Sequence, residues 1–247
     1  MLRLDNVSFK VDDGTEVLEI IDSVSLEIED GSFIVITGPN GGGKSTLARL
    51  IMGIEKPTSG KIWFNDIDIT DMSVTERARL GIGYAFQQPP RFKGLTVRKL
   101  LSLAHGSELP EDECCAYLTS VGLCSREYLN REVDTSLSGG EAKRVEIATL
   151  MARELSLAIF DEPEAGIDMW SFSMLVETFG AMRRQNEKRT TLIISHQERI
   201  MQLADELVII ADGKVRTRGS RDEVFPQIIG KFENACDFRG KGGDDSE

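Results

Sequence analysis

The stretch that most constrains the fold of this chain is GPNGGGKST, residues 38–46, because it separates two different apolar patterns. The run FIVIT precedes it, as expected of a buried strand, and LARLIMG follows with helical periodicity. A glycine, four residues and then Gly43-Lys44-Ser45 in this setting form the phosphate-loop pattern. Its glycines let backbone N–H groups converge on phosphate oxygens, Lys44 adds positive charge, and the Ser45 hydroxyl can ligate Mg²⁺. The sequence therefore predicts a site for a nucleoside triphosphate.

Short continuous apolar runs indicate a parallel sheet that is covered on both faces. The runs SFIVITG, SLAIFDE and TTLIISH, which begin at residues 32, 156 and 190, are rich in Ile, Val and Leu. Two earlier stretches, LRLDNVSFKV and SVSLEIE, alternate apolar and polar residues, which is typical of antiparallel strands. We therefore expect an α/β fold with a mixed sheet core and an antiparallel β subdomain. Ligands of such folds bind at the carboxyl ends of the parallel strands.

The chain between residues 88 and 136 contains no buried-strand run, and it begins with Pro89-Pro90. We interpret it as short helices within a helical subdomain inserted into the core. The predicted organisation is a single domain over residues 1–247. Its parts are the nucleotide-binding core with the antiparallel β subdomain at 1–87 and 155–225, the helical subdomain at 88–154 and a C-terminal segment at 226–247. That segment ends in the polar sequence GKGGDDSE, which we expect to be a disordered tail.

Polar residues at the ends of the predicted strands are candidates for the chemistry. Asp161 and Glu162 end the run LAIFDE, and because side chains alternate along a strand the two cannot do the same job. We expect Asp161 to hold Mg²⁺ and Glu162 to orient or deprotonate the attacking water. His196 ends the third run, where its N–H could donate to a γ-phosphate. Gln87 follows GIGYAF at the start of the insertion, and away from a nucleotide site it would be an ordinary surface amide.

A second glycine-rich turn, LSGGE at residues 137–141, opens a charged helix. Glycine is a poor residue inside a helix, and Ser138 alone could cap it. A helix N-terminus without bulky side chains is, however, a site for an anion. The turn at 138–140 is therefore a second candidate phosphate site.

Composition narrows the ligands and the compartment. The net charge of −12 argues against nucleic acid as the main ligand, because a phosphate backbone needs a basic face. The first residues alternate like a strand rather than a secretory segment, and no apolar run approaches the ~20 residues needed to cross a bilayer. We expect a cytoplasmic protein without direct membrane insertion. Free thiols are expected at the cysteines, which lack a CxxC pattern: Cys114, Cys115, Cys124 and Cys236.

In this order along the chain, the motifs resemble those of the ATP-binding cassette (ABC) ATPases. The resemblance rests on the phosphate loop, Gln87, the LSGGE turn, Asp161-Glu162, Gly166-Ile167-Asp168 and His196. It implies an ATPase of the ABC fold that uses ATP and Mg²⁺. The residues implied for ATP binding are Gly38, Pro39, Asn40, Gly41, Gly42, Gly43, Lys44, Ser45, Thr46, Ser138, Gly139, Gly140 and Asp168. Those implied for Mg²⁺ are Ser45, Gln87 and Asp161, and those for catalysis are Glu162, His196 and Gln87.

The resemblance also implies a head-to-tail dimer of two cassettes that forms on ATP. In such a dimer the turn at 138–140 faces the nucleotide of the other subunit, and Asp168 lies at the seam. One position departs from the family's pattern. Where many members stack the adenine on an aromatic side chain this sequence has Val11, so we expect weak purine selectivity.

Two kinds of ABC ATPase stay open as interpretations. The stretches YAFQQPPRFKGLTV, SGGEAKRVEI, DEPEAGID and SHQERI are similar to SufC, the ATPase of iron–sulfur cluster assembly, which would drive a scaffold of the SufB or SufD type. The alternative is the nucleotide-binding subunit of an ABC membrane transporter, whose partner is a membrane subunit. In both, the helical subdomain is the expected docking surface, with Phe92 between Arg91 and Lys93 as an anchor. A pure interaction module is disfavoured by the presence of Glu162 and His196.

Overall fold

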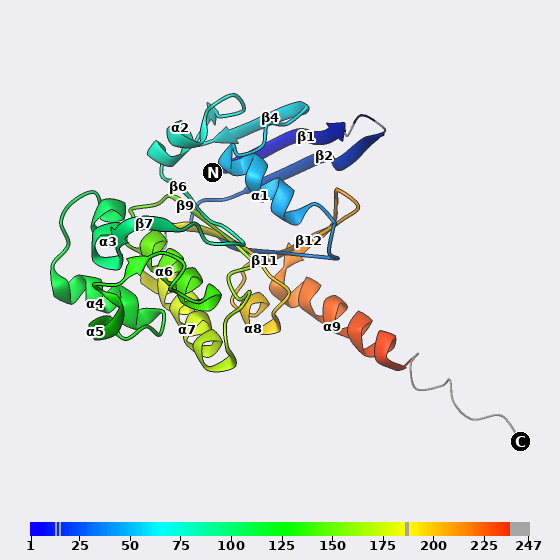
Figure 1. Cartoon of the computed structure of the whole chain (residues 1–247). Helices are drawn as coiled ribbons and strands as arrows, with labels where there is room; N and C mark the ends of the chain where they lie inside the picture. Colours follow the sequence, from blue (N-terminus) through cyan, green and yellow to red (C-terminus); the bar gives the residue numbers. More distant parts are fainter. Residues whose placement is uncertain (13, 15, 186–187, 238–247) are drawn as a thin grey trace, which may run out of the picture.

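The computed structural model describes residues 1–12, 14, 16–185 and 188–237, without the side chains of residues 185 and 231–237. Its described part contains two main sheets, one above the other, with helices between and below them (Figure 1). The tail predicted to be disordered at 240–247 lies outside the described residues. The division of the chain into a core, a helical subdomain and a C-terminal segment stays a prediction.

The three predicted buried runs form the centre of a six-stranded sheet with the order β12-β11-β3-β10-β9-β6. Neighbouring strands from β11 to β6 are parallel, and only β12 runs antiparallel, to β11. The strands are β3 (Phe33–Thr37), β6 (Ile82–Ala85), β9 (Leu157–Asp161), β10 (Thr190–Ile194), β11 (Glu206–Ala211) and β12 (Lys214–Ser220). The mixed sheet is confirmed, and the register of Ile194 with both Ile36 and Asp161 sets the carboxyl ends of β3, β10 and β9 side by side.

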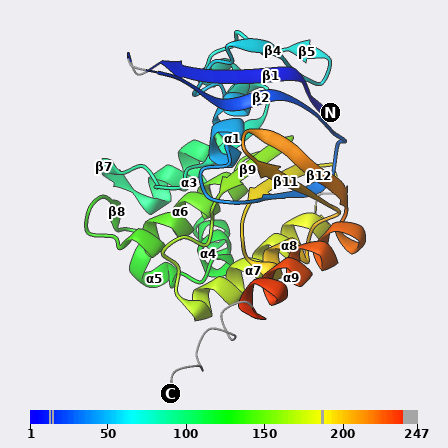
Figure 2. The same ribbon diagram turned by 90° about the vertical axis from the view of Figure 1, so that its right-hand side faces the viewer.

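The alternating stretches near the start form a separate antiparallel sheet with the order β2-β1-β4-β5. Its strands are β1 (Leu2–Asp12), β2 (Val17–Ile28), β4 (Ser59–Phe64) and β5 (Ile67–Asp68). Figure 2 shows this sheet above α1 (Lys44–Met52), with the six-stranded sheet beneath. The antiparallel β subdomain is therefore confirmed, and α1 is enclosed between the two sheets.

Two hydrophobic cores lie on opposite faces of the six-stranded sheet. Side chains alternate along β3, so Phe33 and Val35 join one core while Ile34 and Ile36 join the other. One core contains α1 and the antiparallel sheet, and the other contains the helices of the insertion and of the C-terminal half. Because β3 is buried on both faces, it holds the phosphate loop that follows it on a rigid support.

The remaining helices surround the lower face of the six-stranded sheet, apart from α2, which lies beside the antiparallel sheet (Figure 1). Their bounds are α2 (Val74–Arg79), α3 (Val97–His105), α4 (Glu111–Ser120), α5 (Ser125–Tyr128), α6 (Gly139–Met151), α7 (Met169–Gln185), α8 (Glu198–Met201) and α9 (Arg221–Asp237). No helix in the described ranges is long and apolar enough to cross a membrane.

The insertion differs from the prediction in one respect. We expected only short helices after Gln87, but β7 (Phe92–Thr96) and β8 (Glu132–Val133) pair there as a small antiparallel sheet. Most residues of the two strands are exposed or half-buried, so neither has the apolar run that signals a covered strand. The pairing joins the two ends of the helical segment that contains α3, α4 and α5.

Candidate active site

The phosphate loop joins β3 to α1, and its glycines have structural reasons to be glycine. Gly38 has a φ of 134°, and a Cβ there would lie 2.0 Å from the carbonyl oxygen of Ile210. Gly43 has a φ of 98° and precedes α1, a helix with no side-chain cap and no acidic residue in its first turn. The N–H groups at this helix start are therefore left for an external anion.

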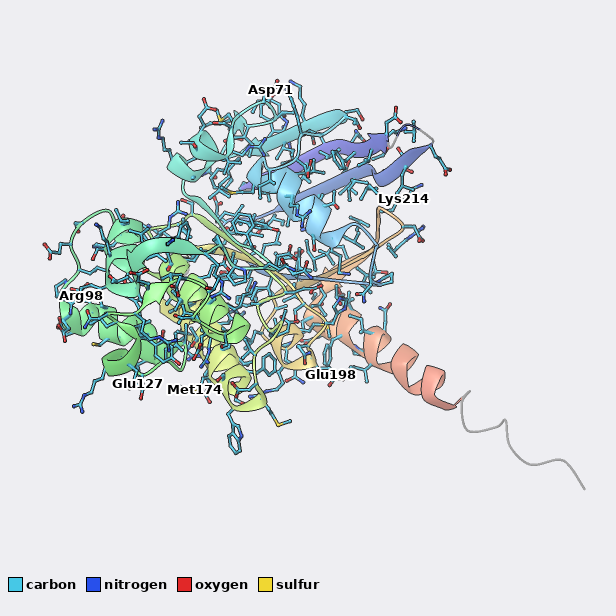
Figure 3. All side chains as sticks on the ribbon, in the orientation of Figure 1. Asp71, Arg98, Glu127, Met174, Glu198 and Lys214 are labelled. Atoms are coloured by element: carbon cyan, nitrogen blue, oxygen red, sulfur yellow. The ribbon has the colours of Figure 1, made fainter. Side chains whose placement is uncertain are left out.

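The turn between β11 and β12 supports the loop from the side. The Gly213 N–H donates to the carbonyl of Gly42 (3.1 Å), and the Gly213 carbonyl accepts from the Asp22 N–H of β2 (3.0 Å). Lys214, labelled in Figure 3 at the tip of this turn, also pairs with the Asp22 carboxylate (2.9 Å). The loop is thus held between the two sheets, which fixes the direction of its backbone N–H groups.

Lys44 is buried within the loop that it would serve. Its Nζ donates to the carbonyls of Gly38 and Pro39, at 2.8 Å in each case. Burial lowers the pKa of Lys44, and the nearby carboxylates of Glu162 and Asp161 oppose that shift. The ammonium is therefore held at the loop by weak carbonyl acceptors, which phosphate oxygens can replace with stronger, charge-assisted hydrogen bonds.

Asp161 ends β9 fully buried, with both carboxylate oxygens in use. Ser45 Oγ donates to Oδ1 (2.9 Å) and the Tyr84 hydroxyl donates to Oδ2 (2.7 Å). Burial and then the Asp161 charge raise the pKa of Tyr84, so this hydroxyl stays a donor. The predictions did not include Tyr84. Its signal was a lone hydroxyl in the apolar run GIGYAF, at the end of a strand that borders β9.

Glu162 follows Asp161 with a left-handed backbone, φ 46°, and its N–H donates to the Ile194 carbonyl (3.0 Å). This turn directs the Glu162 side chain away from that of Asp161 and toward Gln87. Gln87 Nε2 donates to Glu162 Oε2 at 2.7 Å. These two predicted catalytic side chains are therefore in direct contact. Gln87 precedes the helical insertion in the sequence, and Glu162 follows it.

His196 lies just after β10 and is exposed at the edge of the site. Although the side chain is exposed, its partial burial lowers the pKa of His196, the positive charge of Lys44 lowers it further, and Glu162 opposes both effects. The ring is therefore neutral at pH 7, with one nitrogen as a donor and the other as an acceptor. A neutral donor suits an interaction with a phosphoryl oxygen.

One cavity of about 590 Å³ brings most of the predicted residues together. It is lined by Ile20, residues 40–46 of the phosphate loop, Gln87, Glu162 and His196. The turn at 138–140 and Asp168 are not among its lining residues. Val11 is also absent from the lining, and the β2 side chain that faces the cavity is the aliphatic Ile20. Among the described residues, the lining of this cavity therefore contains no aromatic side chain, and the weak purine selectivity stays a prediction.

The turn at 138–140 is built as a cap. Ser138 precedes α6, its Oγ accepts from the Glu141 N–H (3.2 Å), and Glu141 Oε2 accepts from the Ser138 N–H (2.7 Å). Tyr128 also donates to the Glu141 carboxylate, which helps to lower the pKa of that group. A Cβ on Gly140 would lie 2.6 Å from the Gly166 carbonyl, so the turn packs directly against the segment that leads to Asp168.

Asp168 caps the next helix in this structure. Its Oδ1 accepts from the N–H groups of Trp170 and Ser171, both at 3.0 Å, and these bonds lower the Asp168 pKa. Met169 and Trp170 follow it on α7 and are 82% and 86% exposed. The role of Asp168 at a dimer seam stays a prediction.

A buried ion pair on α6 was not predicted. Lys143 Nζ donates to the carbonyls of Phe86 and Asp161, and Glu146 Oε1 accepts from the Phe86 N–H (2.9 Å). One turn of α6 therefore bonds both the backbone N–H and the backbone carbonyl of Phe86, the residue directly before Gln87. The signal was present as two opposite charges three residues apart in a stretch with many apolar residues, AKRVEIATL.

The comparisons with known proteins agree with this geometry. A family model described as ABC transporter matches residues 21–165, which is more than half of the chain. An uncharacterized ABC transporter ATP-binding protein of Methanocaldococcus jannaschii, MJ0035, is 41% identical over 222 residues, covering 87% of this chain and 86% of that protein. The energy-coupling factor transporter ATP-binding protein EcfA2 of Clostridium acetobutylicum is 33% identical over 236 residues, covering 92% of this chain and 82% of that protein.

A solved structure supports the same assignment. The dimeric post-hydrolysis state of the ATP-binding cassette MJ0796, bound to ADP and Pi, matches with a TM-score of 0.79 at 25% identity. The match covers 90% of this chain and 99% of that one. These comparisons give no specific support for SufC. With the family model and the relatives taken together, the chain belongs to the ABC transporter family of ATP-binding cassettes and is an ATPase.

Proposed function

We propose that this chain is the ATP-hydrolysing subunit of an assembly in which two cassettes close on ATP and move a partner protein. The observation that carries this proposal is the contact between Gln87 and Glu162 across the cavity that contains Lys44. In this proposal Lys44 and the loop N–H groups bind the β- and γ-phosphates. Glu162 orients and deprotonates the attacking water, Gln87 holds the Glu162 carboxylate, and His196 donates to the γ-phosphate.

The oxygen donors beside the loop fit Mg²⁺. Ser45 Oγ, the Gln87 side-chain carbonyl and the Asp161 carboxylate are hard oxygen ligands, which this ion prefers. Ser45 and Asp161 are already 2.9 Å apart through a hydrogen bond. When bound, the ion would neutralise charge that develops on the phosphates. Tyr84 keeps the Asp161 carboxylate in a fixed orientation for this role.

The second cassette supplies the part that one chain lacks. The turn at 138–140 does not line the cavity of its own chain, although its helix start suits an anion. We infer that it completes the site of another copy, with Asp168 at the seam. The dimeric form of the related MJ0796 cassette with ADP and Pi supports this inference.

The partner that the comparisons favour is a membrane subunit of a transporter. The printed names of MJ0035 and EcfA2 both describe transporter ATP-binding proteins. In this proposal the chain itself acts on the cytoplasmic side, and the partner crosses the bilayer.

A soluble scaffold of the SufB or SufD type is a second candidate. It is favoured by three charged residues that lie buried or held near the site: Lys143, Glu146 and Glu164. Lys143 and Glu146 form a buried pair (3.8 Å), and Glu164 is held by Ser195 (2.6 Å). These charges belong to SGGEAKRVEI and DEPEAGID, the stretches in which the sequence is similar to SufC. Removing membranes from a native lysate by centrifugation and then purifying the chain separates the two candidates. A membrane subunit would be recovered only from the detergent-solubilised fraction, and a scaffold from the soluble one.

The proposal of a nucleotide-driven dimer is tested by phosphate release and light scattering. We expect the purified chain to release phosphate from Mg-ATP. We expect it to be monomeric alone, because its net charge of −12 repels a second copy and each site is only half built. A tight dimer without nucleotide that ATP leaves unchanged, or no phosphate release, would overturn the proposal.

A further inference from the structure

Two hydrogen bonds tie the turn after β9 to the loop after β10. In the first, the Glu162 N–H donates to the Ile194 carbonyl at 3.0 Å. In the second, the Ser195 hydroxyl donates to Glu164 Oε1 at 2.6 Å. Glu162 and His196, which both line the cavity, lie on these two segments. The link between Glu164 and Ser195 therefore joins the segments that carry two of the proposed catalytic side chains.

Ser195 holds the backbone on both sides of His196. It is fully buried, and its own N–H donates to the Ile36 carbonyl at the end of β3 (3.1 Å). Its Oγ also accepts from the Gln197 N–H at 3.0 Å. Because the same Oγ donates its proton to Glu164, the side chain is fixed in an orientation that also suits Gln197. The backbone that carries the His196 ring thus depends on Glu164.

The His196 ring has little else to hold it. Within the ranges that the structure describes, the ring makes no hydrogen bond of its own. Its place in the cavity is therefore set by the backbone of residues 195–197. Any loss of order in that loop would move the ring relative to Glu162, the residue proposed to activate water.

Glu164 is a strong acceptor in a place where a carboxyl group is unfavourable. The residue is half-buried, and its Oε2 is buried without a hydrogen-bond partner. Burial raises the pKa of Glu164, and the Ser195 hydroxyl, followed by the backbone N–H groups of Glu164 and His196, opposes that shift. At 2.6 Å the bond from Ser195 has the length of a charge-assisted bond, which is about twice as strong as a neutral one. Perturbed acidic groups of this kind gather at functional sites.

We propose that Glu164 is a positioning residue for ATP hydrolysis: by holding the Ser195 hydroxyl, it fixes the His196 ring relative to the Glu162 carboxylate. The inference rests on the proposed function in the roles that it gives to these two side chains. Both must meet the same γ-phosphate and the water that attacks it, so a misplacement of about 1 Å can reduce the rate by up to 10²-fold. The phosphate loop follows β3 and does not include this link, so ATP binding should not depend on it.

The chain contains two histidines, which allows the ring to be observed without any activity. The full chain labelled with ¹³C-histidine should give two Cε1–Hε1 signals in a nuclear magnetic resonance spectrum. His105, on α3, is the internal reference, and the signal that is missing from His196→Gln identifies the other ring. Glu164→Ala and Ser195→Ala should each broaden or split the His196 signal, because the ring gains a second position. The His105 signal should stay unchanged.

Steady-state phosphate release measures the consequence for the reaction. Glu164→Ala should lower kcat about tenfold and change the KM for ATP less than about twofold. Glu164→Gln should lower kcat only about two- to threefold, because its neutral amide oxygen still accepts from Ser195. The matched control Glu177→Ala, at an exposed carboxylate of α7, should change neither kcat nor the His196 signal.

A double-mutant cycle separates positioning from general support of the fold. If Glu164 acts through His196, then Glu164→Ala should change the rate less than about twofold in a His196→Ala background. Single-turnover phosphate release at high protein concentration allows slow variants to be compared. Equal losses in both backgrounds would overturn the inference. An undisturbed His196 signal in both alanine variants, or equal effects of Glu164→Gln and Glu164→Ala, would do the same.

Thermal melts check that each variant folds, and if Glu164→Ala does not, Ser195→Ala takes its place in every measurement. Failure of the proposed function has a different signature. If His196→Ala alone leaves phosphate release unchanged, the catalytic role proposed for His196 is wrong. The ring signals would still decide whether Glu164 positions that side chain.

Discussion

Two helices of this chain begin at glycine-rich turns, and they treat their N-termini in opposite ways. At α1 the cap is Gly43, no side chain bonds the first N–H groups, and Lys44 adds a buried cation. At α6 the cap is Ser138, and Glu141 satisfies part of the helix start with its own carboxylate. The first can bind a phosphate by itself. The second already holds a negative charge, so it attracts a phosphate less strongly than the first.

The largest expected effect comes from a residue that lies on neither of these two helices. Glu162→Gln removes the proposed base and keeps the hydrogen-bonding shape, so steady-state phosphate release should fall by about 10²- to 10⁴-fold. ATP binding should persist, and the dimer should accumulate on light scattering because closure is no longer followed by hydrolysis. Near-normal turnover would remove Glu162 from the mechanism.

The next effect concerns α1 alone. Lys44→Ala should weaken ATP binding on the order of 100-fold, because the phosphates lose a buried cation that makes charge-assisted bonds. Isothermal titration calorimetry with ATP, at a concentration where the chain is monomeric, measures this affinity. Ser138→Ala in the same assay should leave the affinity of the monomer unchanged within error. Equal losses in both variants would mean that the two helix starts share one site within a single chain.

A smaller effect would sharpen the account of α6. Glu141→Gln removes the negative charge from the helix start and keeps an acceptor for the Ser138 N–H. If a partner's phosphate binds there, ATP-driven dimerisation should become about 2- to 5-fold tighter, which corresponds to the 0.3–1 kcal/mol of a charge near a helix end. Sedimentation of the Glu162→Gln background with and without this change measures it. Weaker dimerisation would show that the Glu141 carboxylate itself contacts the other copy.

The smallest effect is a pH dependence on the α1 side. The pKa of His196 is lowered in the folded chain, chiefly by burial, so the unfolded chain takes up a proton first as the pH falls. The contribution of His196 to the free energy of unfolding is present above the pKa of its ring in the unfolded chain, about 6.5. It is lost as the pH falls through that value toward the lower pKa of the ring in the folded chain. In thermal melts between pH 5 and 8, the Tm of the His196→Gln variant should therefore change slightly less with pH than that of the unmodified chain. The ring is exposed, so the difference in Tm should be less than about 2 °C.

The sequence predicted those parts of the site whose signals are local. The phosphate loop, Asp161-Glu162 and His196 each end an apolar run, and register in the sheet then brings them together. The carboxyl ends of parallel strands lie at one edge of a sheet, so the runs alone indicated that these residues share an edge. The order β3-β10-β9, which makes them neighbours, came from the structure.

The parts that were missed depend on contacts that no local pattern encodes. Tyr84 reaches Asp161 only because β6 pairs with β9, and Lys143 reaches the Phe86 carbonyl only because α6 packs beneath that strand end. The strands β7 and β8 have too few buried residues for a periodic signal. The proposed place of Ser138 in the nucleotide site of a second copy is a matter that a resemblance can suggest and one chain cannot reveal.

The left-handed backbone at Glu162 has a consequence for how such a chain can change under selection. Glycine adopts this conformation freely, whereas a residue with a Cβ loses about 1–2 kcal/mol there. Selection for stability alone would therefore replace Glu162 with glycine and, if its proposed role is right, produce a better-folded protein that no longer hydrolyses ATP. Stabilising screens of this cassette should accordingly be run together with an activity screen, because position 162 is where the two demands oppose each other.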